Sequence, residues 1–200
     1  MSTQAEQRLH GVISALVTPF SSGGDVNHEA FQRHVQALSE AGVHGYFVNG
    51  TTGEGAYLST EEKRVQLRIA RETAAAGQII CSAAIQPSTE AVLVEMEALE
   101  PEEPDYVVAV PPFYYAVSQE GIYEHFRRIA QASSAPLIVY DIPQHTQNAV
   151  GPALRRRLVR EGLCVGIKDS TGNFPDFSRL LLEPELGHVA WIQGNDVLDC

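Results

Sequence analysis

The sequence is short of positive charge, of cysteine and of long hydrophobic runs, and each shortage excludes a class of protein. Lys and Arg total 14 against 25 Asp and Glu, which gives a formal net charge of −11. So acidic a chain lacks the basic surface that nucleic acids and anionic membranes require. The longest apolar run, 106–117, is too short to span a bilayer. The polar N-terminal segment also predicts no signal peptide.

Cysteine pairs, metal motifs and nucleotide motifs are missing as well. Cys81, Cys164 and Cys200 lie far apart without a C-x-x-C pair, which argues against a disulfide framework and predicts a reducing cytoplasm. The seven histidines show neither H-E-x-x-H nor H-x-H spacing, so no metal site is predicted. The glycine-rich turn at 50–55 matches neither the phosphate loop nor the dinucleotide fingerprint. We therefore expect a protein that needs no cofactor.

What the sequence does contain is a repeated unit. Seven short runs rich in Val and Ile recur along the chain, and they are near-continuous, as in parallel strands buried on both faces. These runs are 12–20, 45–53, 79–86, 106–114, 136–143, 164–171 and 189–196. Amphipathic or capped segments between them predict helices over 27–41, 59–76, 88–99, 118–132, 149–160 and 173–182.

A strand followed by a helix, repeated, is the unit of both the doubly wound sheet and the (β/α)8 TIM barrel. Seven units of even length, with no glycine fingerprint after the first strand, favour the α/β barrel. We predict a single (β/α) barrel domain over residues 1–200, incomplete at the C-terminus because a barrel needs an eighth unit; the alternative is a domain that closes differently.

Barrels place their functional side chains at the C-terminal ends of the strands. This rule singles out Thr18, the loop 50–54, Tyr114, Tyr140, Lys168 and Gly194. Lys168 is either a solvated lysine at a strand end or an amine in a dry barrel mouth. There, desolvation favours the neutral amine, which can attack a ketone and form a Schiff base.

The other candidates also have two interpretations. Tyr140 is either a half-buried aromatic residue or a phenol for proton transfer. The turn 50–55 is either purely structural or an anion site suited to a carboxylate. Tyr114 follows two prolines, where packing is the default role. The basic run 155–157 is interpreted as a solvated helix face.

Four motifs occur in barrel order: GTTGE (50–54), PFYYAVSQEG (112–121), VYDIP (139–143) and GIKDSTG (166–172). Together they resemble the dihydrodipicolinate synthase and N-acetylneuraminate lyase family of class I aldolases, over about residues 11–196. The resemblance implies a (β/α)8 barrel followed by C-terminal helices, so the eighth βα unit and those helices would be absent from this sequence.

The resemblance also implies the catalytic roles. Lys168 matches the lysine that binds pyruvate, or a pyruvoyl substrate, as an imine. Tyr140 matches the tyrosine that shuttles protons, and Thr51 and Tyr114 match its relay partners. In the family that second tyrosine usually reaches in from a neighbouring subunit, which implies a homotetramer built as a dimer of dimers.

The substrate-binding residues follow in the same way. Thr52 matches the residue that holds the pyruvate carboxylate, in the turn that contains Gly50 and Gly53. Gly194 matches a glycine that lines the pocket. His145 stands where synthases acting on aspartate semialdehyde carry an arginine for the carboxylate of the second substrate.

The departures from the family pattern direct the functional prediction. His145 is a poor carboxylate clamp at neutral pH, and Asp141 replaces the usual Asn. We therefore expect a cytoplasmic carbon–carbon lyase that uses pyruvate and a small aldehyde or oxo-acid. A 2-keto-3-deoxy sugar-acid aldolase is one enzyme of this kind. The alternatives are a true 4-hydroxy-tetrahydrodipicolinate synthase and a non-catalytic oxoacid-binding paralogue.

Overall fold

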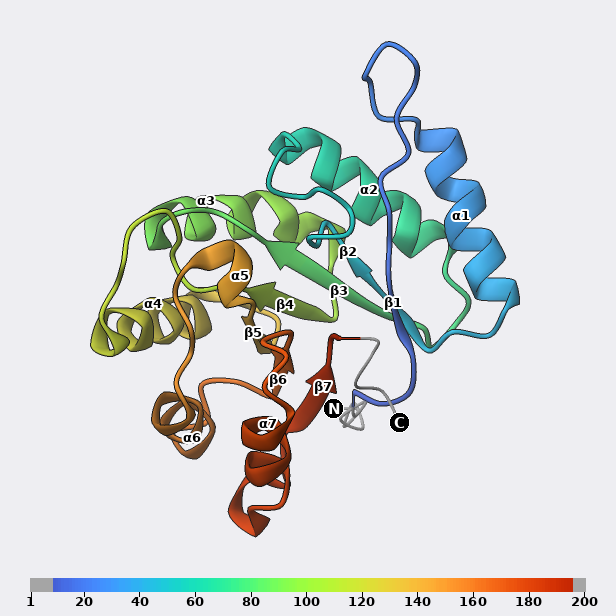
Figure 1. The fold of residues 1–200 in the computed structure, drawn as a ribbon. Coiled ribbons are helices and arrows are strands. Elements are labelled where there is room, and N and C mark those ends of the chain that lie inside the picture. Colours follow the sequence, from blue (N-terminus) through green and yellow to red (C-terminus); the bar gives the residue numbers. More distant parts are fainter. Residues whose placement is uncertain (1–8, 196–200) are drawn as a thin grey trace.

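Seven parallel strands, hydrogen-bonded in the order of the chain, form one curled sheet (Figure 1). The computed structural model describes residues 9–195. The strands are β1 (Ile13–Ala15), β2 (Gly45–Val48), β3 (Ile79–Ala84), β4 (Tyr106–Ala109), β5 (Leu137–Asp141), β6 (Gly166–Asp169) and β7 (Ala190–Gln193). Each lies within one of the seven predicted apolar runs. The predicted strands are therefore confirmed.

Helices connect the strands and cover the outer side of the curl (Figure 1). They are α1 (His28–Glu40), α2 (Thr60–Thr73), α3 (Thr89–Leu99), α4 (Gln119–Ala132), α5 (Pro143–Thr146), α6 (Pro152–Arg160) and α7 (Phe174–Leu181), with the 3-10 turns η1 (Glu100–Glu102) and η2 (Pro184–Leu186). The capping box at the start of α2 is confirmed, because Ser59 and Glu62 bond each other's backbone N–H groups. The short α5 was not predicted.

Two apolar layers hold the sheet in place, and the alternation of side chains along each strand separates them. Val139 of β5 points outward and joins the layer against the helices, with Phe126 of α4. Its neighbours Ile138 and Tyr140 point inward and join the layer inside the curl, with Phe47 of β2. A sheet that is apolar on both faces is the arrangement that the near-continuous runs predict.

The fold is therefore the predicted barrel, present as seven strands whose sheet edges in the described part are β1 and β7. The single domain over residues 1–200 stays a prediction. Cys81 and Cys164 are buried free thiols, and burial raises the pKa of each to about 12; Cys200 lies outside the described residues. No helix within residues 9–195 has the length and apolarity needed to cross a membrane.

Candidate active site

Lys168 and Tyr140 lie side by side at the C-terminal ends of β6 and β5. The strand register pairs the two residues directly. Their side chains point into the curl, since Tyr140 belongs to the inner apolar layer. The sequence predicted both as strand-end residues, and the pairing places their side chains next to each other on the inner face of the sheet.

The ammonium group of Lys168 sits in a corner made by two aromatic rings. Its Nζ lies 4.1 Å from the ring centroid of Phe47 and 4.1 Å from that of Tyr140. The two rings meet edge to face, with centroids 5.9 Å apart. The rings attract a cation and exclude water from one side of the amine. The lysine is thus held in place beside the phenol rather than left free in solvent.

The hydroxyl of Tyr140 belongs to a small group of hydroxyls. Ser170 Oγ donates to it over 3.4 Å and also contacts the carbonyl oxygen of Gly194 at 3.2 Å. Burial raises the pKa of Tyr140, and hydrogen bonds with Ser170 and Thr51 oppose that rise. The phenol is therefore protonated at neutral pH and bonded to the hydroxyls through which a proton can pass.

The turn after β2 is held against β1 by close backbone contacts. Thr18 Oγ1 donates to the carbonyl oxygen of Gly53 over 2.6 Å and accepts from Gln66 at 3.0 Å. A Cβ on Gly53 would lie 2.8 Å from the carbonyl oxygen of Leu16, so only glycine allows this approach. Thr18, which the strand-end rule singled out, therefore positions the turn.

The same turn lies over the ring that contacts the lysine. A Cβ on Gly50 would stand 2.2 Å from the ring of Phe47, so Gly50 leaves room for that ring. The N–H groups of Gly53, Glu54 and Gly55 bond within the turn, to Thr51 and Gly50. Exposed Thr51 and Thr52 remain at its tip.

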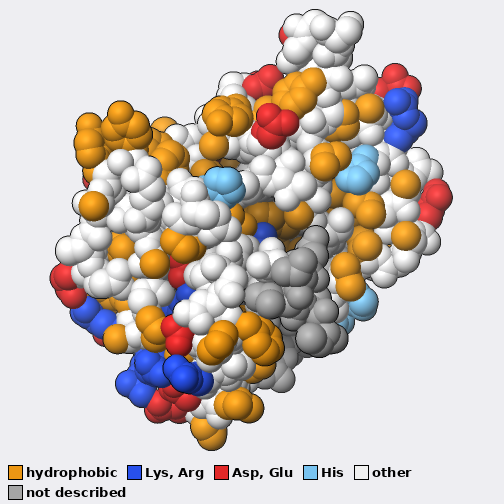
Figure 2. Space-filling view, viewed as in Figure 1, with side chains coloured by type: hydrophobic (Ala, Val, Ile, Leu, Met, Phe, Trp, Pro, Cys, Tyr) orange, Lys and Arg blue, Asp and Glu red, His pale blue; other side chains and the backbone are white. Residues whose placement is uncertain are grey.

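A cavity of about 450 Å³ opens at these strand ends. It is lined by Thr51, Thr52, Tyr140, Ile142, Gln144, Ser170, Gly194 and Asn195. Figure 2 shows a hollow near the middle of the molecule, with hydrophobic side chains and part of a Lys or Arg side chain inside it. Lys168 reaches the wall of this cavity at Gly194, because a Cβ built on Gly194 would lie 2.9 Å from the Cε of Lys168. The absence of a side chain at Gly194 keeps the lysine and the cavity in contact.

A second cavity of about 500 Å³ adjoins the first, because Thr51 and Ile142 line both. His145 lies on its wall, on the short helix α5. Tyr57 and Phe113 add apolar surface, and Glu54 adds a carboxylate. Two joined cavities, one beside the lysine and one beside His145, fit a two-part substrate.

Tyr114 is not brought to the site. It is 73% exposed on the loop after β4, and its ring packs edge to face on that of Tyr115. Its backbone is left-handed, with φ of 80°. Within this chain, then, Lys168, Tyr140, Thr51, Thr52 and Gly194 come together, whereas Tyr114 faces outward.

The interpretation of residues 155–157 as a solvated helix face is wrong for Arg155. Its side chain is only 5% exposed, and it bridges Asp141 and Asp169. Arg156 and Arg157 do lie at the surface and pair with Glu183 and Glu120. A run of like residues in a helix points in several directions, because successive side chains are about 100° apart.

Sequence reasoning missed three residues of the site. Ser170 bonds the Tyr140 hydroxyl, Phe47 packs on Lys168, and Gln144 donates to the Ser170 carbonyl oxygen over 2.9 Å. Ser170 could have been found, since it lies two residues after Lys168 and so points to the same side of the sheet. The contacts of Phe47 and Gln144 depend on how β2 and α5 lie in space.

Fold and site together define a parallel (β/α)-barrel protein centred on a lysine at the end of its sixth strand. Residues 8–199 match the model of the dihydrodipicolinate synthetase family, and the chain belongs to that family. The 4-hydroxy-tetrahydrodipicolinate synthase of Neisseria meningitidis serogroup B is 32% identical over 189 residues, which are 94% of this chain and 64% of that protein.

Solved structures of dihydrodipicolinate synthases have the same fold as this chain. The 4-hydroxy-tetrahydrodipicolinate synthase of Methylacidiphilum fumariolicum SolV matches with a TM-score of 0.88 at 30% identity, over 96% of this chain and 63% of that one. The chloride-inhibited dihydrodipicolinate synthase of Acinetobacter baumannii, complexed with pyruvate, matches with a TM-score of 0.87 at 32% identity, over 93% of this chain and 64% of that one. This chain thus spans less than two thirds of the length of these relatives.

Proposed function

We propose that the protein is a class I aldolase or lyase that binds pyruvate, or a pyruvoyl substrate, as an imine on Lys168. The observation that carries the proposal is the placement of the Lys168 amine, held between two aromatic rings beside the buried Tyr140 hydroxyl. Both groups adjoin a cavity that also receives the hydroxyls of Thr51 and Thr52. The pyruvate bound in the Acinetobacter relative supports the same substrate class.

The chemistry needs only these side chains. The Lys168 ammonium first gives a proton to the Tyr140 hydroxyl group and its partners, and the neutral amine adds to the ketone carbon to form a C–N bond. The carbonyl oxygen then leaves as water with that proton and a second one from the nitrogen, which leaves a protonated imine. The protonated imine then withdraws electrons, so a proton can leave the methyl carbon to give an enamine. That carbon attacks an aldehyde to form a C–C bond, or the reverse sequence breaks one. Water then hydrolyses the imine, which releases the ketone product and restores the amine. No redox step is involved.

Proton transfer is assigned to the hydroxyl group around Tyr140. The phenol is protonated at rest and bonded to Ser170 and Thr51, so it can give a proton to the departing oxygen and recover it. The turn that carries Thr51 and Thr52 supplies hydroxyl donors for the substrate carboxylate. Each role uses an atom that lines the first cavity or contacts it.

The test is borohydride reduction in the presence of pyruvate, followed by peptide mapping. The chain has only two lysines, Lys63 and Lys168, and Lys63 is completely buried in an ion pair. We expect one pyruvate-derived adduct, on Lys168, and none in the variant Lys168→Met. A pyruvate-treated protein that stays unmodified while folded would overturn the proposal and favour a non-catalytic oxoacid-binding protein.

The acceptor that fits the second cavity is a hydroxylated aldehyde. Among the described residues that line this cavity, His145 is the one basic side chain, and it shares the wall with the carboxylate of Glu54. A carboxylate-bearing acceptor would lack the bidentate guanidinium partner that such anions prefer. Hydroxyl groups can bond His145 and Glu54 alike, which supports a 2-keto-3-deoxy sugar-acid aldolase over the 4-hydroxy-tetrahydrodipicolinate synthase named for the relatives.

Replacing His145 with Arg should move specificity toward an acidic acceptor. A charge-assisted hydrogen bond contributes about 1.5–3 kcal/mol, so turnover of aspartate semialdehyde relative to glyceraldehyde should rise by roughly tenfold or more. Steady-state assays of both aldehydes measure the ratio. If it stays constant while adduct formation on Lys168 is intact, His145 does not select the acceptor and the synthase assignment is favoured.

The assembly is part of the same proposal. Tyr114 and Tyr115 expose 73% and 74% of their surface on one loop, and two neighbouring exposed aromatics are typical of a protein interface. A homotetramer built as a dimer of dimers would cover them and could bring Tyr114 to a neighbour's site. The cytoplasmic location also stays a prediction.

A further inference from the structure

A buried ionic network lies directly behind the two central residues of the site. Asp141 and Asp169 follow Tyr140 and Lys168, end β5 and β6, and are paired in register. Because side chains alternate along a strand, both carboxylates point away from the cavity, toward the helices. There Arg155 of α6 contacts both, and the side chains of the three residues are at most 5% exposed.

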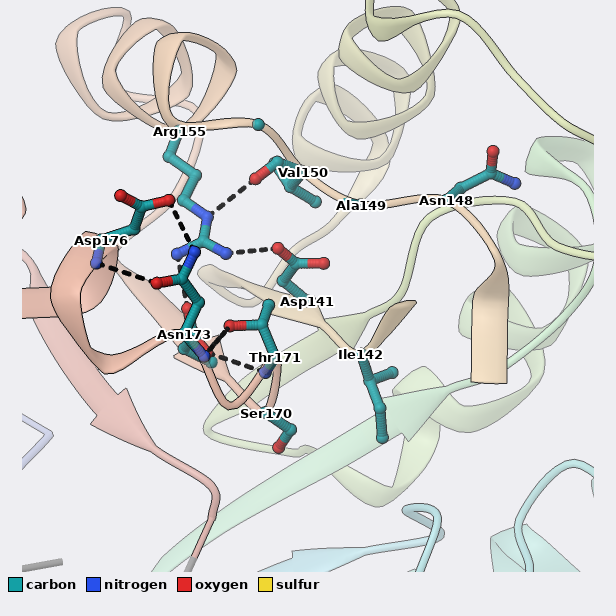
Figure 3. Close-up of polar contacts among 12 residues, drawn as sticks. Asp141, Ile142, Asn148, Ala149, Val150, Arg155, Ser170, Thr171, Asn173 and Asp176 are labelled. Carbon is teal, nitrogen blue, oxygen red and sulfur yellow. Dashed lines mark hydrogen bonds and ion pairs between the residues drawn. The ribbon is translucent and has the colours of Figure 1, made fainter. Parts of the chain in front are cut away.

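The network holds two acids and one base, and its two acids are unequally bonded. Asp169 receives Arg155 on one oxygen, at 2.5 Å, and the backbone N–H and hydroxyl of Thr171 on the other, each at 2.8 Å. Asp141 receives Arg155 on one oxygen, while its other oxygen, Oδ1, has no hydrogen bond of ordinary geometry. The nearby backbone N–H of Val150 is its one further donor, against two on Asp169. Figure 3 shows Arg155 reaching from α6 to Asp141 and to the carbonyl of Val150.

The same network is continuous with the proton-transfer group. The carbonyl oxygen of Asp141 accepts the backbone N–H of Ser170 at 2.9 Å, and the Ser170 hydroxyl bonds that of Tyr140. Arg155 therefore holds the ends of β5 and β6 against α6. These strand ends carry Tyr140, Lys168 and Ser170. The network touches neither cavity, so its action on the reaction is through position.

We propose that Asp141, Arg155 and Asp169 form a buried positioning network that sets Lys168 against Tyr140, and that Asp141 is its surplus acid. An asparagine at 141 would keep the bond to Arg155 through its amide oxygen and remove the uncompensated charge. An asparagine at 169 would place an amide against the Thr171 donors and lose a bond. The network thus predicts opposite effects for two substitutions of the same chemical kind.

The sign of the pH dependence follows from the charges that act on Asp141. Burial raises the pKa of Asp141 above its ordinary value of 3.8 and Asp169 adds to that rise, while Arg155 and the backbone N–H of Val150 oppose it. The folded state therefore holds a proton that the unfolded chain has released, and stability falls as pH rises through this range. Asp141→Asn removes that loss.

The first experiment measures thermal unfolding of the full chain and its variants from pH 4 to pH 8. We expect Asp141→Asn to melt higher than the parent at pH 8, with the gap closing as pH falls toward 4. Asp169→Asn should melt lower than the parent throughout. A lower melting temperature for Asp141→Asn at pH 8, or equal effects of the two substitutions, would overturn the assignment of Asp141 as the surplus acid.

The second experiment tests positioning and rests on the proposed imine chemistry. We expect pyruvate and borohydride to label Lys168 at least about tenfold more slowly in folded Arg155→Met, because small displacements of reacting groups are costly. Arg157→Met is the matched control, since Arg157 pairs with Glu120 and Glu161 and stacks on the Tyr123 ring, without a contact to Asp141 or Asp169. If Arg155→Met does not fold, Asp141→Asn combined with Arg155→Met removes one charge of each sign and carries the same expectation.

Reductive methylation of the lysines with formaldehyde separates this proposal from the proposed function, because it needs no pyruvate. If the parent protein forms no pyruvate adduct, the proposed function fails, and the ratio of the Lys168 methylation rate in each variant to that in the parent still reports on the placement of the amine. We expect this ratio to differ from one in the Arg155 variant and not in Arg157→Met. Labelling by both reagents at the parent rate would overturn the positioning role.

Discussion

Gly194→Ala should slow imine formation on Lys168 by about a hundredfold, because a displacement of around 1 Å can cost that much in rate. The new methyl group would stand 2.9 Å from Lys168 Cε and 2.4 Å from Ser170 Oγ, both closer than ordinary contact, and 3.3 Å from the Asp169 carbonyl oxygen, which needs to give by only a few tenths of an ångström. The outer part of the lysine side chain and a serine hydroxyl can move aside at little cost in folding energy. The amine and the hydroxyl are the two groups that the proposed reaction needs in place.

The measurement is the rate of borohydride trapping with pyruvate, together with the melting temperature. Gly187→Ala is the matched control, since its methyl group would meet only the Pro184 carbonyl oxygen, at 3.5 Å. We expect both variants to melt close to the parent and only Gly194→Ala to lose trapping. A Gly194→Ala protein that traps pyruvate at the parent rate would show that the lysine acts from another position.

Lys63→Met should lower the free energy of unfolding by about 3–5 kcal/mol, the usual cost of breaking a buried ion pair from one side. Lys63 of α2 and Glu95 of α3 are 0% and 2% exposed and bond to each other. Gln86 also donates to Glu95, over 3.0 Å. Without the ammonium, Glu95 keeps only this amide and must carry a buried charge or take up a proton.

Urea unfolding of Lys63→Met, and of the same change combined with Glu95→Gln, measures the effect. The double variant removes both charges and should recover most of the lost stability. If the single variant loses less than about 1 kcal/mol in free energy of unfolding, the pair contributes no more than a surface salt bridge, and the expected cost of leaving Glu95 buried without its partner is wrong. The double variant also retains Lys168 as its one lysine, which simplifies mapping of the adduct.

The sequence predicted the strands and the long helices because each is encoded locally. Val- and Ile-rich runs mark strands buried on both faces, and Ser59 with Glu62 marks a helix start. The helix α5 escaped prediction because its four residues carry no period and follow directly on the apolar run of β5. Such a short helix is set by the loop it belongs to.

The site was predictable where it depends on strand ends and not where it depends on packing between distant elements. Lys168 and Tyr140 end buried strands, so their meeting follows from the parallel order. Arg155 was misjudged from its charge, although helix α6 offers a signal: Leu158 and Val159, three and four residues on, are buried on the same face. Its ion-pair partners, Asp141 and Asp169, cannot be recognised from the sequence until the pairing of β5 with β6 is known.

The order of the strands has a consequence for how the chain can fold during synthesis. Each strand from β2 to β7 pairs with the strand before it in the chain, so among the described strands no pairing must wait for a distant segment. The sheet can grow one unit at a time as the chain emerges, which keeps loop-closure costs small. The site is assembled differently, since Thr51 follows β2 and Gly194 follows β7. Structure can thus accumulate from the first strands, whereas the candidate pocket comes together only when the seventh is added.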